Sequence, residues 1–371
     1  MSENDPRSCP YSNYPDTSFW SKSVAQADVA SFDPVVGTKF RIASTDKIAT
    51  AGSCFAQHIA RHLKRSGYQY FVTEKCPDLF PDDVKQKFNF EVFSARYGNI
   101  YTARQLLQLF DRVYAAFVPV EDVWRQGDRL FDPFRPHIQP GGFGSLNEYR
   151  IDREQHFRAV RSLFENCDVF IFTLGLTEAW ESCIDQSVFP VCPGCGVGSF
   201  DASKYRFVNF DYDDTLADMT AFCERLRAVN PAVRVLLTIS PVPLIATAEP
   251  RHVLVSTVYS KSVLRAVAGK LEALLPFAGY FPSYEIITGQ QAGNEFFAQN
   301  RRSVTELGVE AVMRVFMRHY CSTPTSLPPY DGSLNALPDA TANVPANSAT
   351  RSPLELVCDE EQVEAFMRGY F

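Results

Sequence analysis

The sequence predicts an α/β protein built on a mostly parallel sheet, and three observations lead to this prediction. Short apolar runs alternate along the chain with segments of helical periodicity. The runs at residues 168–174 and 233–239 are continuously apolar, as expected for strands that are buried on both faces. Helical segments of roughly 10–15 residues separate the strands, which is typical of βαβ units in a parallel sheet.

The elements follow from this pattern in chain order. Strands are expected at residues 47–51, 67–72, 168–174, 233–239 and 279–287. Helices are expected directly after residue 52, and then at residues 103–116, 153–166, 214–229, 261–275 and 309–320. Ligands of such sheets bind beyond the carboxyl ends of the strands. Chemistry is therefore expected just after Ala51, Leu174, Ile239 and Tyr284.

The chain divides into four segments. Residues 1–44 are expected to form an aromatic-rich arm packed on the domain, and residues 45–321 form the α/β domain. Residues 322–353 are rich in Pro, Ser and Asn and contain few large apolar side chains, which predicts a linker. Residues 354–371 have amphipathic helical character, so we expect a helix that docks on its own domain or on a partner.

Composition excludes several functional classes. The 371 residues carry a net charge of −7, which argues against nucleic acid as the main partner because phosphate binding needs a basic face. No apolar run reaches the roughly 18 residues of a membrane span, and the first residues do not resemble a secretory signal. The ten cysteines are scattered along a long chain, so we expect reduced thiols and a cytoplasmic protein.

The sharpest local feature is Gly52-Ser53-Cys54, at the first junction between strand and helix. A glycine allows a tight turn, and a thiol at a helix N-terminus feels the positive end of the helix dipole, which favours the thiolate. Neighbouring backbone N–H groups can hold an oxyanion. His58 follows Cys54 by four residues, so on a helix the two would share a face.

The segment Ala51-Gly52-Ser53-Cys54-Phe55-Ala56 resembles the signature of the GSCFA-domain proteins, a bacterial family placed in the SGNH/GDSL hydrolase superfamily. The resemblance covers about residues 10–320 and includes residues 97–102, 174–180, 240–244, 259–261 and 280–285. It implies a flavodoxin-like three-layer α/β/α fold, similar to SGNH hydrolases, and acyl-ester chemistry.

The resemblance also implies roles for individual residues. Cys54 stands where the superfamily places its nucleophile, and Gly98, with Asn99 beside it, stands where a backbone N–H donates to the oxyanion. Gly175 opens the third block, in which Thr177 replaces the usual amide with a hydroxyl donor.

The fourth block departs from the superfamily pattern. SGNH hydrolases carry Asp-x-x-His there, with the histidine as general base, whereas this chain has Asn-Arg-Arg-Ser at residues 300–303. Without the acid and the imidazole, the ordinary triad mechanism fails. Arg302 is a candidate for binding an anionic donor, with a solvated arginine as the alternative.

Three hypotheses follow. In the first, Cys54 is the nucleophile and His58 or Glu178 handles the proton, because a thiol needs less activation than a hydroxyl. In the second, Ser53 is the nucleophile. In the third, the fold is catalytically inactive and binds a ligand or partner.

The expected function is therefore a hydrolase or acyltransferase, an esterase-like enzyme acting on a small-molecule or carbohydrate ester. No cofactor is expected, although acyl-CoA is a candidate donor substrate. Cys192-Pro193-Gly194-Cys195 lacks a second pair of ligands at metal-binding spacing, so we predict a surface loop and no metal site there.

Overall fold

The computed structural model describes residues 9–322. The predicted linker beyond its first residue and the predicted C-terminal helix at residues 354–371 lie outside the described residues. Among the helices that are described, none combines the length and the apolar character needed to cross a membrane.

A four-stranded parallel sheet forms the centre of the domain, which confirms the predicted α/β class. Its spatial order is β1-β4-β8-β9, with bounds Ile48–Gly52, Val169–Leu174, Arg234–Ile239 and Ala278–Phe281. Nearly every residue of these strands is buried, because helices cover both faces. The first three carboxyl ends lie within a residue of the predicted positions.

The predicted strand at residues 67–72 is wrong as a full strand. The segment pairs with β1 only through a parallel bridge between Tyr70 and Ile48. The pairing with β1 ends there because the chain that follows bonds to another segment: the Thr73 N–H donates to the Ser94 carbonyl at 2.8 Å. Counting this bridge as the second strand, the order is that of flavodoxin-type sheets, whose strand order reverses beside the first strand. The ligand crevice of such a sheet lies between the ends of β1 and β4.

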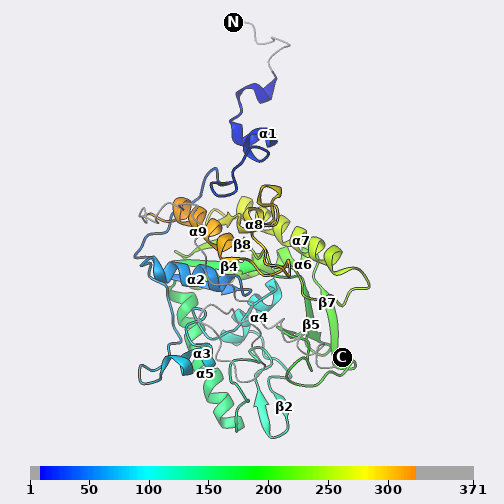
Figure 1. Cartoon of the computed structure of the whole chain (residues 1–371). Coiled ribbons are helices and arrows are strands. Elements are labelled where there is room, and N and C mark those ends of the chain that lie inside the picture. Colours follow the sequence, from blue (N-terminus) through cyan, green and yellow to red (C-terminus); the bar gives the residue numbers. More distant parts are fainter. Residues whose placement is uncertain (1–8, 323–371) are drawn as a thin grey trace, which may run out of the picture.

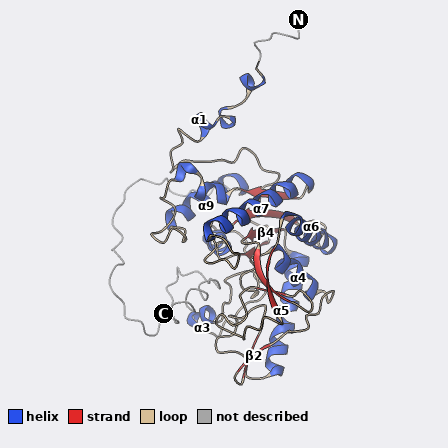
Figure 2. Ribbon diagram, turned by 90° about the vertical axis from the view of Figure 1, so that its right-hand side faces the viewer, coloured by secondary structure: helices blue, strands red, loops and turns tan. Residues whose placement is uncertain are grey.

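Helices cover both faces of the sheet, giving three layers (Figures 1 and 2). One apolar cluster joins a face of the sheet to α4, α5, α6 and α7, at Ala103–Val113, Leu146–Asn166, Tyr212–Val229 and Val253–Leu274. A second cluster joins the other face to α2, α8 and α9, at Ala56–Arg65, Ser283–Thr288 and Glu306–Tyr320. In β4, Phe170 and Phe172 face the first cluster, whereas Val169 and Ile171 face the second.

Two kinds of boundary differ from the prediction. The last strand ends at Phe281 instead of residue 287, because the Ser283 hydroxyl donates to the Ile239 carbonyl at 2.9 Å and the chain turns into α8. Tyr284 therefore lies in a helix. Helices α5, α7 and α9 begin earlier than predicted, after the N-capping side chains of Ser145, His252 and Thr305.

Several short elements were not predicted. The antiparallel sheet β6-β5-β7 comprises Val188–Phe189, Glu178–Ser182 and Tyr205–Asn209. A hairpin joins β2, Trp124–Gln126, to β3, Arg129–Phe131. The remaining elements are α3, Asp82–Lys87, and the 3-10 turn η3, Gln290–Ala292. Residues of β5, β6 and β7 line a cavity that is described below.

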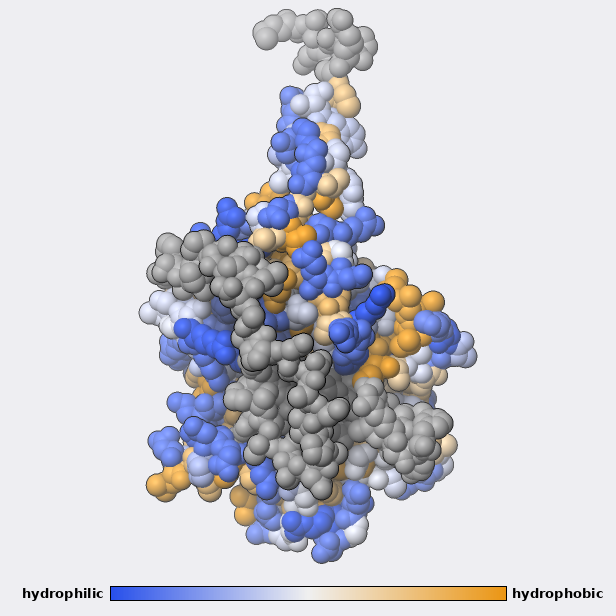
Figure 3. All heavy atoms as spheres, viewed as in Figure 1, coloured by the Kyte–Doolittle hydropathy of each residue, from blue (hydrophilic) through white to orange (hydrophobic). Residues whose placement is uncertain are grey.

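The N-terminal arm has two parts. From Val29 onwards it lies against the second apolar cluster, where Val35 and Phe40 also pack. Before that, η1, η2 and α1 (Pro10–Asn13, Asp16–Ser18 and Trp20–Ser23) bury no residue. Figures 1 and 3 show this first part standing away from the body of the protein.

Replacing Gly52 by alanine is expected to lower the free energy of unfolding by about 3 kcal/mol or more. Gly52 has φ +134°, and an added Cβ would lie 2.3 Å from the Thr173 carbonyl oxygen, so strain and overlap add together. Gly67→Ala is the matched control, because Gly67 has φ +75° with open space around a Cβ, and it should lose only ~1 kcal/mol. Urea unfolding measures both, and equal losses would contradict the close approach of β1 to β4.

Candidate functional site

The turn after β1 is built on Gly52. The Gly52 carbonyl accepts a hydrogen bond from the Ile100 N–H at 2.9 Å, and the Ser53 N–H donates to the Thr173 carbonyl at 3.2 Å. The chain is thus held between the 98–101 loop on one side and β4 on the other. This is the crevice that the sheet order indicates as a ligand site.

Ser53 and Cys54 face different surroundings. The Ser53 side chain lies against Gly175, where an added Cβ would come within 3.1 Å of its own Cβ. Its hydroxyl is buried and has no hydrogen-bond partner within residues 9–322. Cys54, 4% exposed, packs against Val242 and Val304, which come from the loops after β8 and before α9. Among residues 9–322, no base is therefore hydrogen-bonded to the Ser53 hydroxyl.

Cys54 lies just before α2. The Gln57 N–H donates to the Cys54 carbonyl at 3.1 Å, so the residue belongs to the turn that opens the helix. The helix dipole gives this end a partial positive charge that favours an anion such as a thiolate.

The 98–101 loop stands beside that turn. Gly98 has φ +72°, a conformation that favours glycine, and its N–H has no acceptor in the described part of the chain. Asn99 is buried and accepts a long hydrogen bond from Gln57 Nε2 at 3.5 Å. The Ile100 N–H ties the loop to the Gly52 carbonyl, so the loop that carries Gly98 is anchored to the turn before Cys54.

The third segment follows β4 and is held by α7. The Gly175 and Leu176 N–H groups both donate to the Tyr101 carbonyl at 3.0 Å. The Lys261 ammonium donates to the Gly175 carbonyl at 2.7 Å, and the Ser260 hydroxyl accepts from the Thr177 N–H at 3.0 Å. Lys261 is only 1% exposed. The Ser260-Lys261 pair thus positions this backbone against the turn.

Thr177 uses its hydroxyl within the fold. Its Oγ1 donates to Asn209 Oδ1 at 2.7 Å. The orientation of the Asn209 amide is fixed, because its Nδ2 donates to Glu249 Oε1 at 2.9 Å. The Thr177 proton is therefore committed to Asn209 and is not aimed at an oxyanion in this arrangement.

His58 is not hydrogen-bonded to Cys54. Helix α2 begins only at Ala56, so Cys54 precedes the helix and the expected four-residue spacing on one face does not apply. The His58 ring packs 5.5 Å from the Phe55 ring, centroid to centroid. Burial, followed by the charge of Arg61, lowers the pKa of His58 to about 4, so the imidazole is neutral at pH 7.

Glu178 lies at the start of β5, where its carboxylate is bonded to Thr247 and not to Cys54. Its Oε1 accepts from the Thr247 hydroxyl at 2.7 Å, and burial raises the pKa of the carboxyl above its usual value. It lines a cavity of about 280 Å³ whose walls are mostly apolar and include Leu176, Trp180 and Leu244. Two of its lining residues, Leu176 and Leu244, follow Gly175 and Val242 in the sequence by one and two positions. Gly175 lies against Ser53, and Val242 packs on Cys54.

The cysteine pair at 192 and 195 also lines this cavity. An interaction between the two thiols lowers the pKa of Cys195 to about 7, and the same interaction, followed by burial, raises that of Cys192. Val191 and Val197 on either side are buried, so the segment is a cavity wall instead of the predicted surface loop. Within residues 9–322, no three His, Cys, Asp or Glu side chains are grouped so as to hold a metal ion.

The loop before α9 reaches Cys54, as the alignment of blocks implied. The Asn300 side chain accepts from the N–H groups of Arg302 and Ser303, each at 3.0 Å, and this turn directs Val304 onto Cys54. The Arg302 guanidinium donates to the Pro243 carbonyl at 3.2 Å. The side chain that this loop places on Cys54 is therefore apolar.

Sequence reasoning missed the residues that pack on Cys54 and those that hold the third segment. Val242 and Val304 are apolar residues in loops, and nothing in the sequence around them indicates that they pack on Cys54. Ser260 and Lys261 were noted, but their bonds to Thr177 and Gly175 join α7 to the end of β4, which no local pattern reveals.

Comparison with protein families adds one finding. The model of the GSCFA family matches residues 47–316, a span that includes every segment of the site described above. A search of curated proteins gives no match.

A His58→Gln variant is expected to flatten the dependence of stability on pH between 6.5 and 4. The pKa of His58 is lowered to about 4 in the folded protein, so the unfolded chain binds the extra proton in this window and the folded state loses stability as the pH falls. The wild type should lose roughly 2–3 kcal/mol more than the variant between pH 7 and 4.5. Urea unfolding at both pH values measures this difference.

Gln69→Asn is the control, because it changes an exposed polar side chain and removes no titratable group. Its pH dependence should match that of the wild type. Identical slopes for the wild type and His58→Gln would show that the His58 imidazole is not buried as described.

Proposed function

We propose that this chain, which belongs to the GSCFA family, is an acyl-ester hydrolase or acyltransferase with Cys54 as its nucleophile. The observation that carries the proposal is the position of Cys54. It lies at the opening of α2, in the crevice between β1 and β4, and the 98–101 loop, whose Gly98 N–H has no acceptor among the described residues, is bonded through Ile100 to the same turn. These are the parts that nucleophilic acyl transfer needs: a thiol, a positive local field and an oxyanion donor.

We further propose that the family is related to the SGNH/GDSL hydrolases. The strand order and the convergence of loops 98–101, 175–177 and 300–304 on one turn support that relation. These observations support a common arrangement of strands and loops. They do not by themselves support a common function, because one fold can carry many functions.

The chemistry consists of two transfers. The Cys54 thiolate attacks the carbonyl carbon of the donor, a bond from sulfur to carbon forms, and the bond to the leaving group breaks. The N–H groups of Gly98 and Cys54 hold the negative oxygen. The hydroxyl of an acceptor, or water, then attacks the Cys54 thioester and gives its proton to solvent as the thiolate is released.

The missing imidazole favours a thioester donor over an ordinary ester. A leaving thiolate needs no general acid, whereas an alkoxide does. His58 is neutral but not bonded to Cys54, and Glu178 is bonded to Thr247, so neither is in place to protonate a leaving alkoxide in this arrangement. Acyl-CoA is therefore our preferred donor class, with no further cofactor.

The larger cavity supports an apolar acyl group. Its walls are mostly apolar and include Leu176, whose N–H shares the Tyr101 carbonyl with the N–H of Gly175. A carbohydrate acceptor rests on the resemblance to the superfamily alone. The nine cysteines of the described chain are free thiols, which supports our proposal of a reducing, cytoplasmic setting.

A second candidate function is a non-catalytic binding module. The segment at residues 300–303 has neither the acid nor the imidazole of the superfamily pattern, Val304 packs on Cys54, and the Thr177 hydroxyl is committed to Asn209. These features would suit a fold that holds a ligand without reacting with it.

Intact mass after exposure to acetyl-CoA or to an activated ester separates the two. We expect the wild type and Ser53→Ala to gain one acyl group, and Cys54→Ala to gain none. Cys76→Ala is the matched control, because Cys76 is equally buried and is not part of the turn before α2, and it should be acylated like the wild type. An adduct lost only in Ser53→Ala would move the nucleophile to Ser53. The absence of any adduct would favour the binding module.

A further inference from the structure

A second site is indicated by Arg112, which lies in α4 and is only 8% exposed. Its guanidinium carbon lies 3.6 Å from the centre of the Phe134 ring. None of the guanidinium N–H groups has an acceptor within residues 9–322. Burial lowers the pKa of Arg112 to about 10, which still leaves it charged at pH 7. A buried charged group without hydrogen-bond partners is costly, so something is expected to satisfy it.

Asp132 and Asp152 already accept hydrogen bonds from other groups. Asp132 raises the pKa of Arg112, but its two oxygens accept from Arg135 Nε at 2.8 Å and from the Phe134 N–H at 2.9 Å. Asp152 accepts from Arg96 and Arg135. The negative charge of Asp132 therefore stabilises the charged form of Arg112 without a hydrogen bond between the two side chains, and the guanidinium N–H groups remain available to a ligand.

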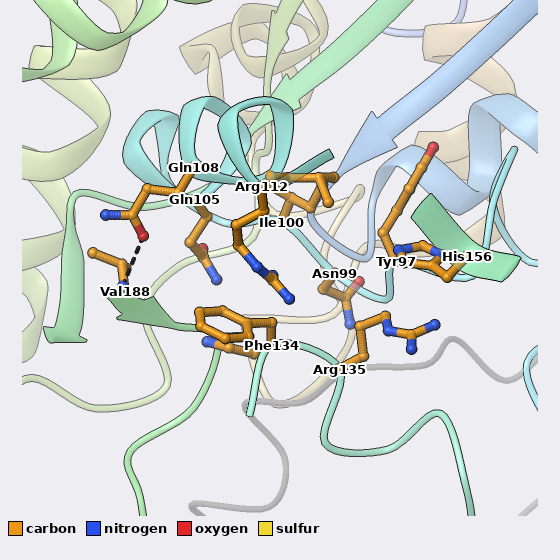
Figure 4. A pocket seen from close by; sticks show the side chains of 12 residues that line it. Tyr97, Asn99, Ile100, Gln105, Gln108, Arg112, Phe134, Arg135, His156 and Val188 are labelled. Atoms are coloured by element: carbon orange, nitrogen blue, oxygen red, sulfur yellow. Dashed lines mark hydrogen bonds between the residues drawn. The ribbon is translucent and has the colours of Figure 1, made fainter. Parts of the chain in front are cut away.

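These donors face a small cavity of about 30 Å³. Figure 4 shows the side chains of Gln105 and Arg112 directed from α4 toward Phe134, with Asn99 and Arg135 beside them. The lining offers N–H donors and one further positive charge, but no carboxylate.

The amide of Gln105 has a fixed orientation. Its Oε1 accepts from the N–H groups of Tyr101 and Thr102, at 2.9 and 3.0 Å, as part of the capping box of α4. The oxygen is thus turned to the loop and Nε2 is the end left for the cavity. In the described part of the chain Nε2 has no acceptor, so it adds a second open donor beside Arg112.

We infer that this cavity binds a carboxylate group, held by the guanidinium of Arg112 and the amide of Gln105. A guanidinium matches the two oxygens of a planar carboxylate, and a cavity of about 30 Å³ has room for a group of this size. The inference goes beyond the proposed acyl chemistry and does not depend on the reactivity of Cys54.

The carboxylate has two possible sources. One is a small free acid. The other is the end of a longer acid whose apolar part lies in the 280 Å³ cavity, since Gln105 and Pro190 line both cavities. Acetate and octanoate distinguish these sources, because only octanoate gains from apolar burial.

Titration calorimetry and thermal unfolding in a chloride-free buffer test the site. We expect both acids to bind and to raise the melting temperature, with octanoate at least tenfold tighter if the two cavities hold one ligand and equal affinities if they do not. Arg112→Met should weaken acetate binding at least tenfold, whereas the exposed control Arg125→Gln should not change it. Absence of binding by both acids, or binding retained in Arg112→Met, would overturn the inference.

Gln105→Glu keeps the test independent of any folding defect in Arg112→Met. A glutamate at this position preserves the capping-box acceptor and places a carboxylate beside Arg112. We expect a higher melting temperature without ligand and no further rise on adding acetate. A lower melting temperature, or an unchanged response to acetate, would contradict an anion site. The same measurements in Cys54→Ala should give the wild-type result, so a failure of the acyl chemistry leaves this inference intact.

Discussion

The close approach of β1 to β4 at Gly52 is the constraint on which the site depends. Because Gly52 has no Cβ, its backbone can lie against Thr173, and the chain can turn at once into α2. That turn puts Ser53 against Gly175 and leaves Cys54 at the helix opening. A side chain at residue 52 would push the turn away from β4 and separate the thiol from the loops that surround it.

Tethers between distant segments complete the site. Ile100 ties the 98–101 loop to Gly52, and the buried Lys261 holds the Gly175 carbonyl from α7. These bonds fix backbone groups in place instead of adding reactive side chains. The bonds therefore fix the position of a thiol and of backbone N–H donors. For this reason a mechanism with a good leaving group fits the site better than one that needs a general base.

The sequence was informative where the signal is local. The glycine turn before Cys54 and the apolar runs ending at Leu174 and Ile239 were placed within a residue, because burial on both faces leaves a continuous pattern. The sequence could not show that Ser283 bonds to Ile239 and ends β9 early, since that bond joins two strands. Arg112 was missed for the same reason: it lies on a polar stripe of α4, and its burial comes from Phe134, more than twenty positions away.

The central claim is that Cys54 is a reactive thiol in this crevice. The rate of Cys54 alkylation by iodoacetamide as a function of pH, followed by peptide mass spectrometry, tests it most directly. The account predicts half-maximal reactivity well below pH ~8.5, the value of an ordinary cysteine, and faster labelling than at the equally buried Cys76. Half-maximal reactivity at or above that value, with Cys54 no faster than Cys76, would contradict it.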